Sequence, residues 1–146
     1  MRMLTPLLAT SAVLGACSLH VGRTPVPAPS AVQGTLAQIY YWRAKPGKFD
    51  EYTRYVRDIA EPIDAEGQRN GAFLSVTTFM TRDTTSAWTH MRVFALRDST
   101  QLREMSGKLD AAGARLEPDS VKRRLRGEYS ATLRDRVGAA TVEILR

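Results

Sequence analysis

The chain has 146 residues, with only one cysteine and two histidines among them. A single cysteine excludes an intrachain disulfide. The sequence contains no HxxxH or CxxC spacing and no paired-carboxylate pattern that would provide a metal site or a general acid–base pair. It also lacks a GxGxxG or P-loop motif for a nucleotide. We therefore expect no metal and no cofactor.

An apolar run long enough to cross a membrane is missing as well. The N-terminal run from Leu4 to Ala16 follows Arg2. As a helix it would reach about 20 Å, whereas a hydrocarbon core is about 30 Å thick. This length is typical of a cleavable secretory leader. The sequence thus predicts a signal peptide over residues 1–16.

The apolar run ends in Leu14-Gly15-Ala16-Cys17. This tetrapeptide resembles the lipobox of bacterial lipoproteins, in which cleavage precedes the cysteine and its thiol receives lipid. The resemblance implies that Cys17 is lipidated, with acyl chains such as palmitate that anchor the protein firmly. Ser18 follows in place of aspartate, which implies the outer membrane, facing the periplasm. An ordinary leader with a chance cysteine is the alternative.

Residues 17–34 form the lipidated cysteine and a proline-rich linker. Pro25, Pro27 and Pro29 favour extended backbone and exclude helix. His20 lies in this segment, and a lone histidine in a linker is not expected to bind a metal. The segment has few large apolar side chains, so we expect a stalk that carries one folded domain over residues 35–146.

Charge does not point to a nucleic-acid partner. The chain has 21 basic and 15 acidic residues, a net charge of +6, but its arginines are scattered. We interpret the excess as solvation and leave contact with anionic lipid headgroups open. The basic cluster Lys122, Arg123, Arg124 and Arg126 is likewise interpreted as a solvated helix face.

The domain alternates strand and helix patterns. Residues 35–42 are rich in aromatic and β-branched types and predict a strand, and residues 72–81 and 86–96 predict a hairpin. Apolar spacings of three and four predict a helix from Phe49, bent by Pro62 near an end marked by Gly67 and by Asn70-Gly71. Asp98 and Gln101 predict the capped start of a second helix. A third helix is expected from Pro118 to Gly138, and residues 139–146 fit either a fourth strand or a frayed helix end.

This order, βαββα(α)β, predicts an α+β, ferredoxin-like fold with a four-stranded antiparallel sheet. Strands one and three carry apolar groups on both faces, although the helices cover only one face. A second copy of the sheet is the simplest cover for the other face.

Two segments carry a resemblance to the dimeric α/β-barrel superfamily. They are IYYWRAKPGKFDEY over residues 39–52 and AWTHMRVF over residues 87–94. The superfamily includes cofactor-independent monooxygenases, stress-responsive barrel proteins and haem proteins. The resemblance implies a homodimer with a cavity between sheet and helices in each protomer. The haem branch needs a histidine on a helix, which neither His20 nor His90 provides.

The candidate site residues follow from alternation along the third strand. Trp88, His90, Arg92 and Phe94 should share one face. If that face lines the cavity, His90 can take a proton and Arg92 can stabilise an enolate or peroxide anion. Further hydroxyls would come from three tyrosines: Tyr41, Tyr52 and Tyr55. The alternative places His90 with Arg92 in solvent or at the dimer interface, and Tyr52, Tyr55 and Trp88 in ordinary packing.

Three functions remain open at this point. The favoured one is an envelope lipoprotein, of a stress-associated kind, that binds a small hydrophobic or aromatic ligand. The second is an enzyme similar to the cofactor-independent monooxygenases. The third is a structural or assembly partner at the outer membrane.

Overall fold

The computed structural model describes residues 34–145, so the predicted signal peptide, Cys17 and the predicted linker before Gly34 lie outside the described residues. The elements in chain order are β1 Leu36–Ala44, α1 Phe49–Tyr55, the π-helical η1 Val56–Ala60, α2 Glu61–Arg69, β2 Ser75–Met80, β3 His90–Leu96, α3 Ser99–Leu116, α4 Ser120–Leu133 and β4 Arg134–Glu143.

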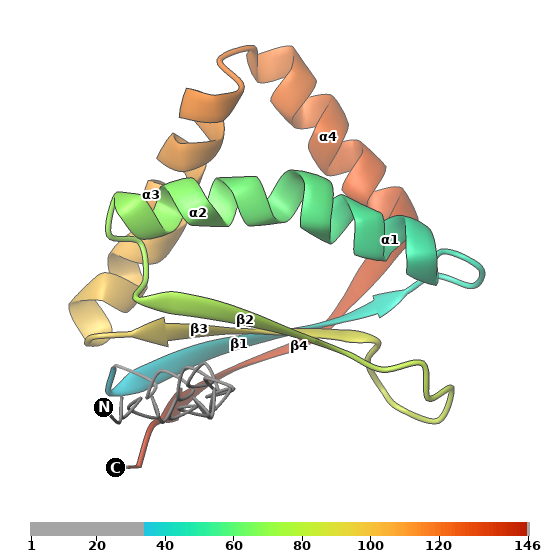
Figure 1. Ribbon diagram of the computed structural model, residues 1–146, viewed down its shortest axis with the longest axis horizontal. Helices are drawn as coiled ribbons and strands as arrows, with labels where there is room; N and C mark the ends of the chain where they lie inside the picture. Colours follow the sequence, from blue (N-terminus) through green and yellow to red (C-terminus); the bar gives the residue numbers. More distant parts are fainter. Residues whose placement is uncertain (1–33, 146) are drawn as a thin grey trace, which may run out of the picture.

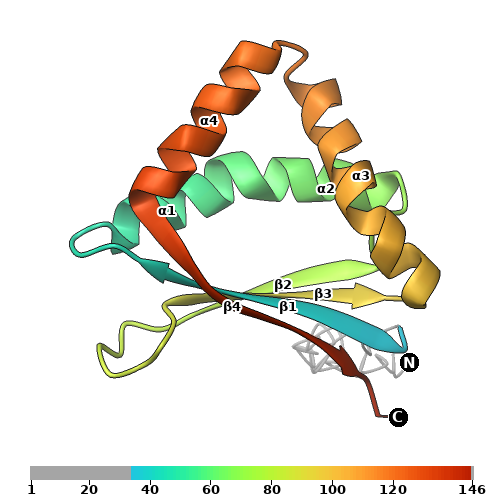
Figure 2. The same ribbon diagram turned by 180° about the vertical axis from the view of Figure 1, so that it is seen from behind.

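The four strands form one antiparallel sheet in the order β2-β3-β1-β4. All helices lie on the same side of this sheet (Figure 1, Figure 2). The predicted α+β, ferredoxin-like fold is therefore confirmed.

The C-terminal strand starts earlier than the sequence predicts. The third helix ends at Leu133, and β4 pairs with β1 from Arg134 onward, so the expected helix up to Gly138 is wrong. Tyr41 pairs with Gly138 whereas the next residue, Trp42, pairs with Arg136. This irregularity leaves Val137 as an extra residue in β4, a β-bulge. Pairing with a central strand overrides the weak strand propensity of this segment.

The helical stretch that begins at Phe49 continues past Pro62 to Arg69, close to the end predicted at Asn70-Gly71. Its turn just before Pro62 is widened, and the N–H of Glu61 donates to the carbonyl of Val56, five residues back. Proline lacks an N–H and its ring collides with the preceding helical turn, which the wider π turn accommodates.

Gly67 lies inside this helix rather than at its end. A Cβ atom there would stand 2.8 Å from Cδ2 of Leu109 on α3, so glycine lets α2 and α3 approach closely. The chain leaves the helix at Asn70 and at Gly71, whose φ of +79° favours glycine. The predicted stop at Asn70-Gly71 is thus confirmed.

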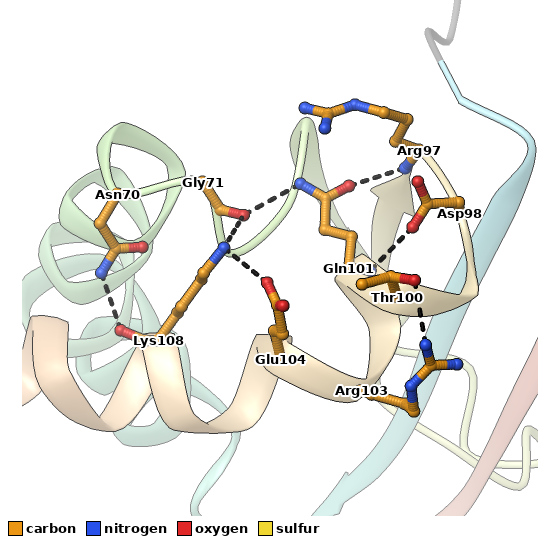
Figure 3. A network of polar contacts seen from close by, with 9 residues as sticks. All are labelled: Asn70, Gly71, Arg97, Asp98, Thr100, Gln101, Arg103, Glu104 and Lys108. Atoms are coloured by element: carbon orange, nitrogen blue, oxygen red, sulfur yellow. Dashed lines mark hydrogen bonds and ion pairs between the residues drawn. The ribbon is translucent and has the colours of Figure 1, made fainter.

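Figure 3 shows the polar network that holds the start of α3. Asp98 accepts a hydrogen bond from the N–H of Gln101 at 2.9 Å, as the capping pattern predicts. The Gln101 amide oxygen accepts from the N–H of Arg97, and its nitrogen donates to the carbonyl of Gly71 at 3.0 Å. One side chain therefore joins the end of β3 to the turn that follows α2.

The interior contains two separate apolar clusters. The first joins the α2–β2 turn to β3 and α3 and consists of Ala72, Phe73, Phe94, Leu96 and Met105. The second joins α1 to the end of α4 and consists of Tyr52, Val56 and Leu133. Helices α3 and α4 rise from opposite ends of the sheet and meet at a turn far from it (Figure 1, Figure 2). The two clusters consequently remain apart above the middle of the sheet.

The face of the sheet that carries no helix is apolar. We call it the open face; its large side chains are Ile39, Tyr41, Phe79, Met91, Val93 and Val142. Phe79 is 46% exposed and Val142 is 40% exposed, while Ile39 and Val93 are half-buried. The prediction of a sheet with apolar groups on both faces is confirmed.

Candidate functional site

A cavity of about 810 Å³ lies between the sheet and the helices, where the two apolar clusters are separated. Its floor is the helix-covered face of β1 and β3, and its walls come from all the helical segments. The lining residues are Tyr40, Trp42, Tyr55, Ala60, Ile63, Asp64, Arg92, Phe94, Leu109, Asp110, Ala111, Gly113, Ala114, Arg123, Arg126 and Arg134.

Strand register places the floor residues next to one another. Tyr40 pairs with Arg92, and Gln38 pairs with Phe94, so these side chains share one face of the sheet. The Tyr40 and Phe94 rings meet edge to face with centroids 5.9 Å apart. The ring of Tyr40 also contacts the ring of Trp42, with centroids 5.5 Å apart. The floor is therefore an aromatic surface interrupted by one guanidinium group.

Arg92 forms an ion pair with Asp64 of α2 at the side of this floor. Their side chains are only 8% and 7% exposed, so both charges are buried. Arg92 also donates to Thr78 Oγ1 at 3.4 Å. Burial lowers the pKa of the guanidinium from its ordinary value, yet an arginine stays charged, and the carboxylate beside it compensates that charge.

Arg134 stacks on the aromatic side of the cavity. Its Cζ lies 4.8 Å from the ring centroid of Trp42 and 5.5 Å from that of Tyr52. Its Nε donates to Ser130 Oγ at 3.1 Å. The indole Nε1 of Trp42 is buried and has no hydrogen-bond partner among the described residues. Buried donors are seldom left unpaired, so this N–H is an exception within the described part of the chain.

Two further arginines reach the cavity from α4. Arg123 donates to the carbonyls of Glu117 and Pro118, at 2.7 and 2.8 Å. Arg126 forms no hydrogen bond or ion pair with any residue in the described part of the chain. The exposed Asp110 is the second acidic residue of the lining.

His90 does not line the cavity. Its side chain is fully buried between the rings of Phe49, at 4.9 Å, and Tyr52, at 4.5 Å. Both ring nitrogens are within hydrogen-bond distance of hydroxyls, Nε2 with Thr53 at 3.0 Å and Nδ1 with Thr89 at 2.9 Å. Burial lowers its pKa to about 4. His90 is thus a buried, neutral residue, outside both the solvent and the cavity lining.

The predicted tyrosines have different positions. Tyr55 lines the cavity. Tyr52 is buried behind it, and burial raises its pKa to about 12, an effect that the charges of Arg134 and Arg92 oppose. Tyr41 belongs to the open face, because it pairs with Met91 and Gly138.

Trp88 is not on the face that alternation predicts for it. The strand begins at His90, so Trp88 lies in the preceding loop, where alternation does not apply. Its ring contacts Tyr41 of the open face, with centroids 6.4 Å apart. The structure therefore brings Arg92 and Tyr55 to the cavity and keeps Tyr41 and Trp88 on the opposite side of the sheet.

Several lining residues were not among the sequence candidates. Asp64, Arg126 and Arg134 come from three different elements, so no local motif connects them. The spacing of arginines in the basic cluster of α4 was one sequence signal that could have indicated lining residues. Arg123 and Arg126 are three residues apart and share a helix face, whereas Arg124 lies between them and is exposed.

The described residues contain no group of three or more histidine, cysteine, aspartate or glutamate side chains that could hold a metal ion. Within residues 34–145, every helix is too short or too polar to cross a bilayer.

No known family model matches the chain, and no curated protein is similar to it in sequence. Solved structures are similar in fold. HapK from Hahella chejuensis matches with a TM-score of 0.53 and 10% identity, over 75% of this chain and 92% of that chain. PA3566 from Pseudomonas aeruginosa matches with a TM-score of 0.46 and 16% identity, over 80% and 97% of the two chains. At 10% identity the likeness to HapK shows the fold alone, and on that evidence this chain carries a ferredoxin-like domain.

Proposed function

We propose that the domain binds a small hydrophobic or aromatic molecule in the cavity between sheet and helices. The observation that carries this proposal is the gap between the two apolar clusters, which is hollow and floored by aromatic rings. Its volume of about 810 Å³ lies within the range of small-molecule sites, roughly 300–1,000 Å³. Protein interiors are normally close-packed, so a domain that bound no ligand would be more stable if its side chains filled this space.

The second part of the proposal concerns location. The lipobox-like segment ending at Cys17 supports a lipid anchor in the bacterial envelope, at the outer membrane facing the periplasm. Mass spectrometry of the membrane-extracted protein tests this directly. We expect the mature chain to begin at an acylated Cys17. An unmodified cysteine, or cleavage elsewhere, would refute the anchor.

We also propose that two copies associate through the open face. Its apolar side chains, including Phe79 and Val142, are left uncovered by the helices. Exposed apolar side chains that gather on one face are typical of interaction sites. The dimer would leave the cavity accessible, because the cavity is on the other side of the sheet.

The monooxygenase alternative finds less support in the geometry. A general base has to reach the proton that it removes, within hydrogen-bond distance or through one water. His90 is outside the cavity lining, and both its nitrogens already face threonine hydroxyls. Binding without catalysis is therefore the function that the arrangement favours.

The test uses N-phenyl-1-naphthylamine, an uncharged aromatic dye that fluoresces in apolar sites, with the unlipidated chain from residue 17 onward. We expect saturable binding that Ala114→Trp abolishes, because Ala114 lines the cavity and an indole would fill it. Ala131→Trp is the matched control, since Ala131 is exposed on α4 outside the lining. Absence of binding, or full binding in the Ala114→Trp protein, would contradict the proposal.

A further inference from the structure

We infer that the ligand carries an acidic group, such as a carboxylate, sulfonate or phosphate, and that Arg126 and Arg134 receive it. This inference rests on the proposed function and specifies the chemical class of its ligand. The molecule would be an apolar or aromatic acid, with its apolar part on the floor of the cavity.

The first argument is the charge of the lining. Four arginines and two aspartates face the cavity. Arg92 and Asp64 neutralise each other in their buried ion pair. Three guanidinium groups then remain against the single carboxylate of Asp110, which is exposed. A cavity with this excess attracts anions, and its partly enclosed position strengthens the attraction relative to an exposed surface.

The second argument is that donors are free to bind. Arg126 has no partner among residues 34–145. Arg134 uses only its Nε in a hydrogen bond, so its terminal nitrogens are available. The Arg134 guanidinium lies over the indole ring of Trp42, which lines the cavity. Guanidinium groups bind carboxylate and phosphate oxygens through strong, charge-assisted hydrogen bonds.

The third argument concerns the rest of the ligand. An inorganic anion would satisfy the arginines but leave the rings of Tyr40 and Phe94 uncovered. An uncharged hydrophobe would cover those rings but would take water from the guanidinium groups of Arg126 and Arg134 without offering them an acceptor, which costs free energy. Only a molecule with both parts satisfies the whole lining.

Two dyes that differ by one sulfonate group separate these cases. 8-Anilinonaphthalene-1-sulfonate is the anionic counterpart of N-phenyl-1-naphthylamine, with the same ring system. We expect the unlipidated chain from residue 17 onward to bind the sulfonate at least about tenfold more tightly than the uncharged dye, the gain typical of a charge-assisted contact. Equal affinities would overturn the inference while leaving the proposed function in place. Binding of neither dye would contradict the proposed function itself and the inference with it.

A pair of variants on one helix locates the acidic group. Arg126→Gln should reduce the preference for the sulfonate about tenfold, because it weakens binding of the sulfonate far more than it changes binding of the uncharged dye. Arg124→Gln makes the same charge change at an exposed residue whose side chain pairs with Glu128 outside the cavity. An equal loss in the Arg124→Gln protein would show a long-range charge effect and would contradict the proposed contact. Because Arg126 has no partner among the described residues, its substitution should not lower the stability of the fold.

Discussion

Arg92 of the central strand β3 and Asp64 of α2 form a buried ion pair that joins the sheet to the helix layer beside the cavity. Both residues line the cavity wall, so the pair belongs to the site as well as to the core. Its position explains why the third strand can hold an arginine on its covered face. It also means that the charge of Arg92 is already compensated, so the acidic ligand that we propose would bind the other arginines of the lining.

Removing the carboxylate of this pair should destabilise the domain strongly. In Asp64→Asn the Arg92 charge stays buried without its counter-ion, which costs about 3–5 kcal/mol in comparable pairs. Urea unfolding followed by circular dichroism measures the loss. The double variant Asp64→Leu with Arg92→Met should recover most of it, since no charge is then buried. A single variant as stable as the natural chain would show that the pair is solvated.

His90 should make the fold sensitive to acid. Burial lowers its pKa from 6.5 to about 4 in the folded state, so the unfolded chain binds more protons between these values. Stability from this group is therefore complete above about pH 6.5 and is lost as the pH falls toward about 4. We expect a decrease of about 2–3 kcal/mol in the free energy of unfolding between pH 7 and pH 4.5.

Carboxylates also contribute to acid unfolding, so His90→Gln serves as the reference. The variant lacks the titrating ring and should lose only the part of the pH dependence that His90 supplies. Urea titrations of both proteins at pH 7 and pH 4.5 give the difference. Identical pH dependence would mean that His90 is protonated normally in the folded protein.

Charge introduced on the open face should prevent association. Val93 lies on a central strand and is half-buried on that face, so Val93→Arg would place a guanidinium between two packed sheets. We expect a dimer for the natural chain and a folded monomer for the variant, with dimer affinity lower by at least about tenfold. Sedimentation equilibrium measures this. Ser106→Arg, at an exposed position of α3, is the control, and a natural chain that stays monomeric at high concentration would refute the dimer.

The N-cap of α3 should contribute less to the free energy of unfolding than the buried Asp64–Arg92 pair. In Asp98→Ala the N–H of Gln101 loses its acceptor, which we expect to cost about 1 kcal/mol. Asp119 caps α4 in the same way through Val121 and Lys122, so Asp119→Ala should have a similar effect. Asp110→Ala, which removes an aspartate without a cap, is the control. Thermal unfolding compares the three variants, and equal melting temperatures for all of them would contradict the assigned caps.

Local signals were sufficient to predict most of the fold. The strand β1, the hairpin and the start of α3 follow from side-chain types and from the Asp98 cap, which act over a few residues. The start of β4 was missed because residues 134–138 become a strand only by pairing with β1. Such pairing depends on distant chain segments and leaves little trace in local propensity.

The site was less predictable than the fold. Alternation correctly placed His90, Arg92 and Phe94 on one face. It failed for Trp88 because β3 begins at His90, two residues after Trp88. It also could not distinguish a cavity from a packed interior on that same face. His90 is covered by Tyr52 and Phe49 of α1, whereas Arg92 is paired with Asp64 of α2 and lines the cavity.

The binding site can be located directly through the two tryptophans, the only ones in the sequence. Trp42 lines the cavity, while Trp88 contacts the open face, so their indole N–H signals in a ¹⁵N–¹H spectrum report on opposite sides of the sheet. Trp42→Phe and Trp88→Phe assign the two signals. On addition of 8-anilinonaphthalene-1-sulfonate, we predict that the Trp42 signal shifts in a saturable manner and that the Trp88 signal stays in place. A shift of Trp88 alone, or of neither signal, would contradict a ligand site in the cavity.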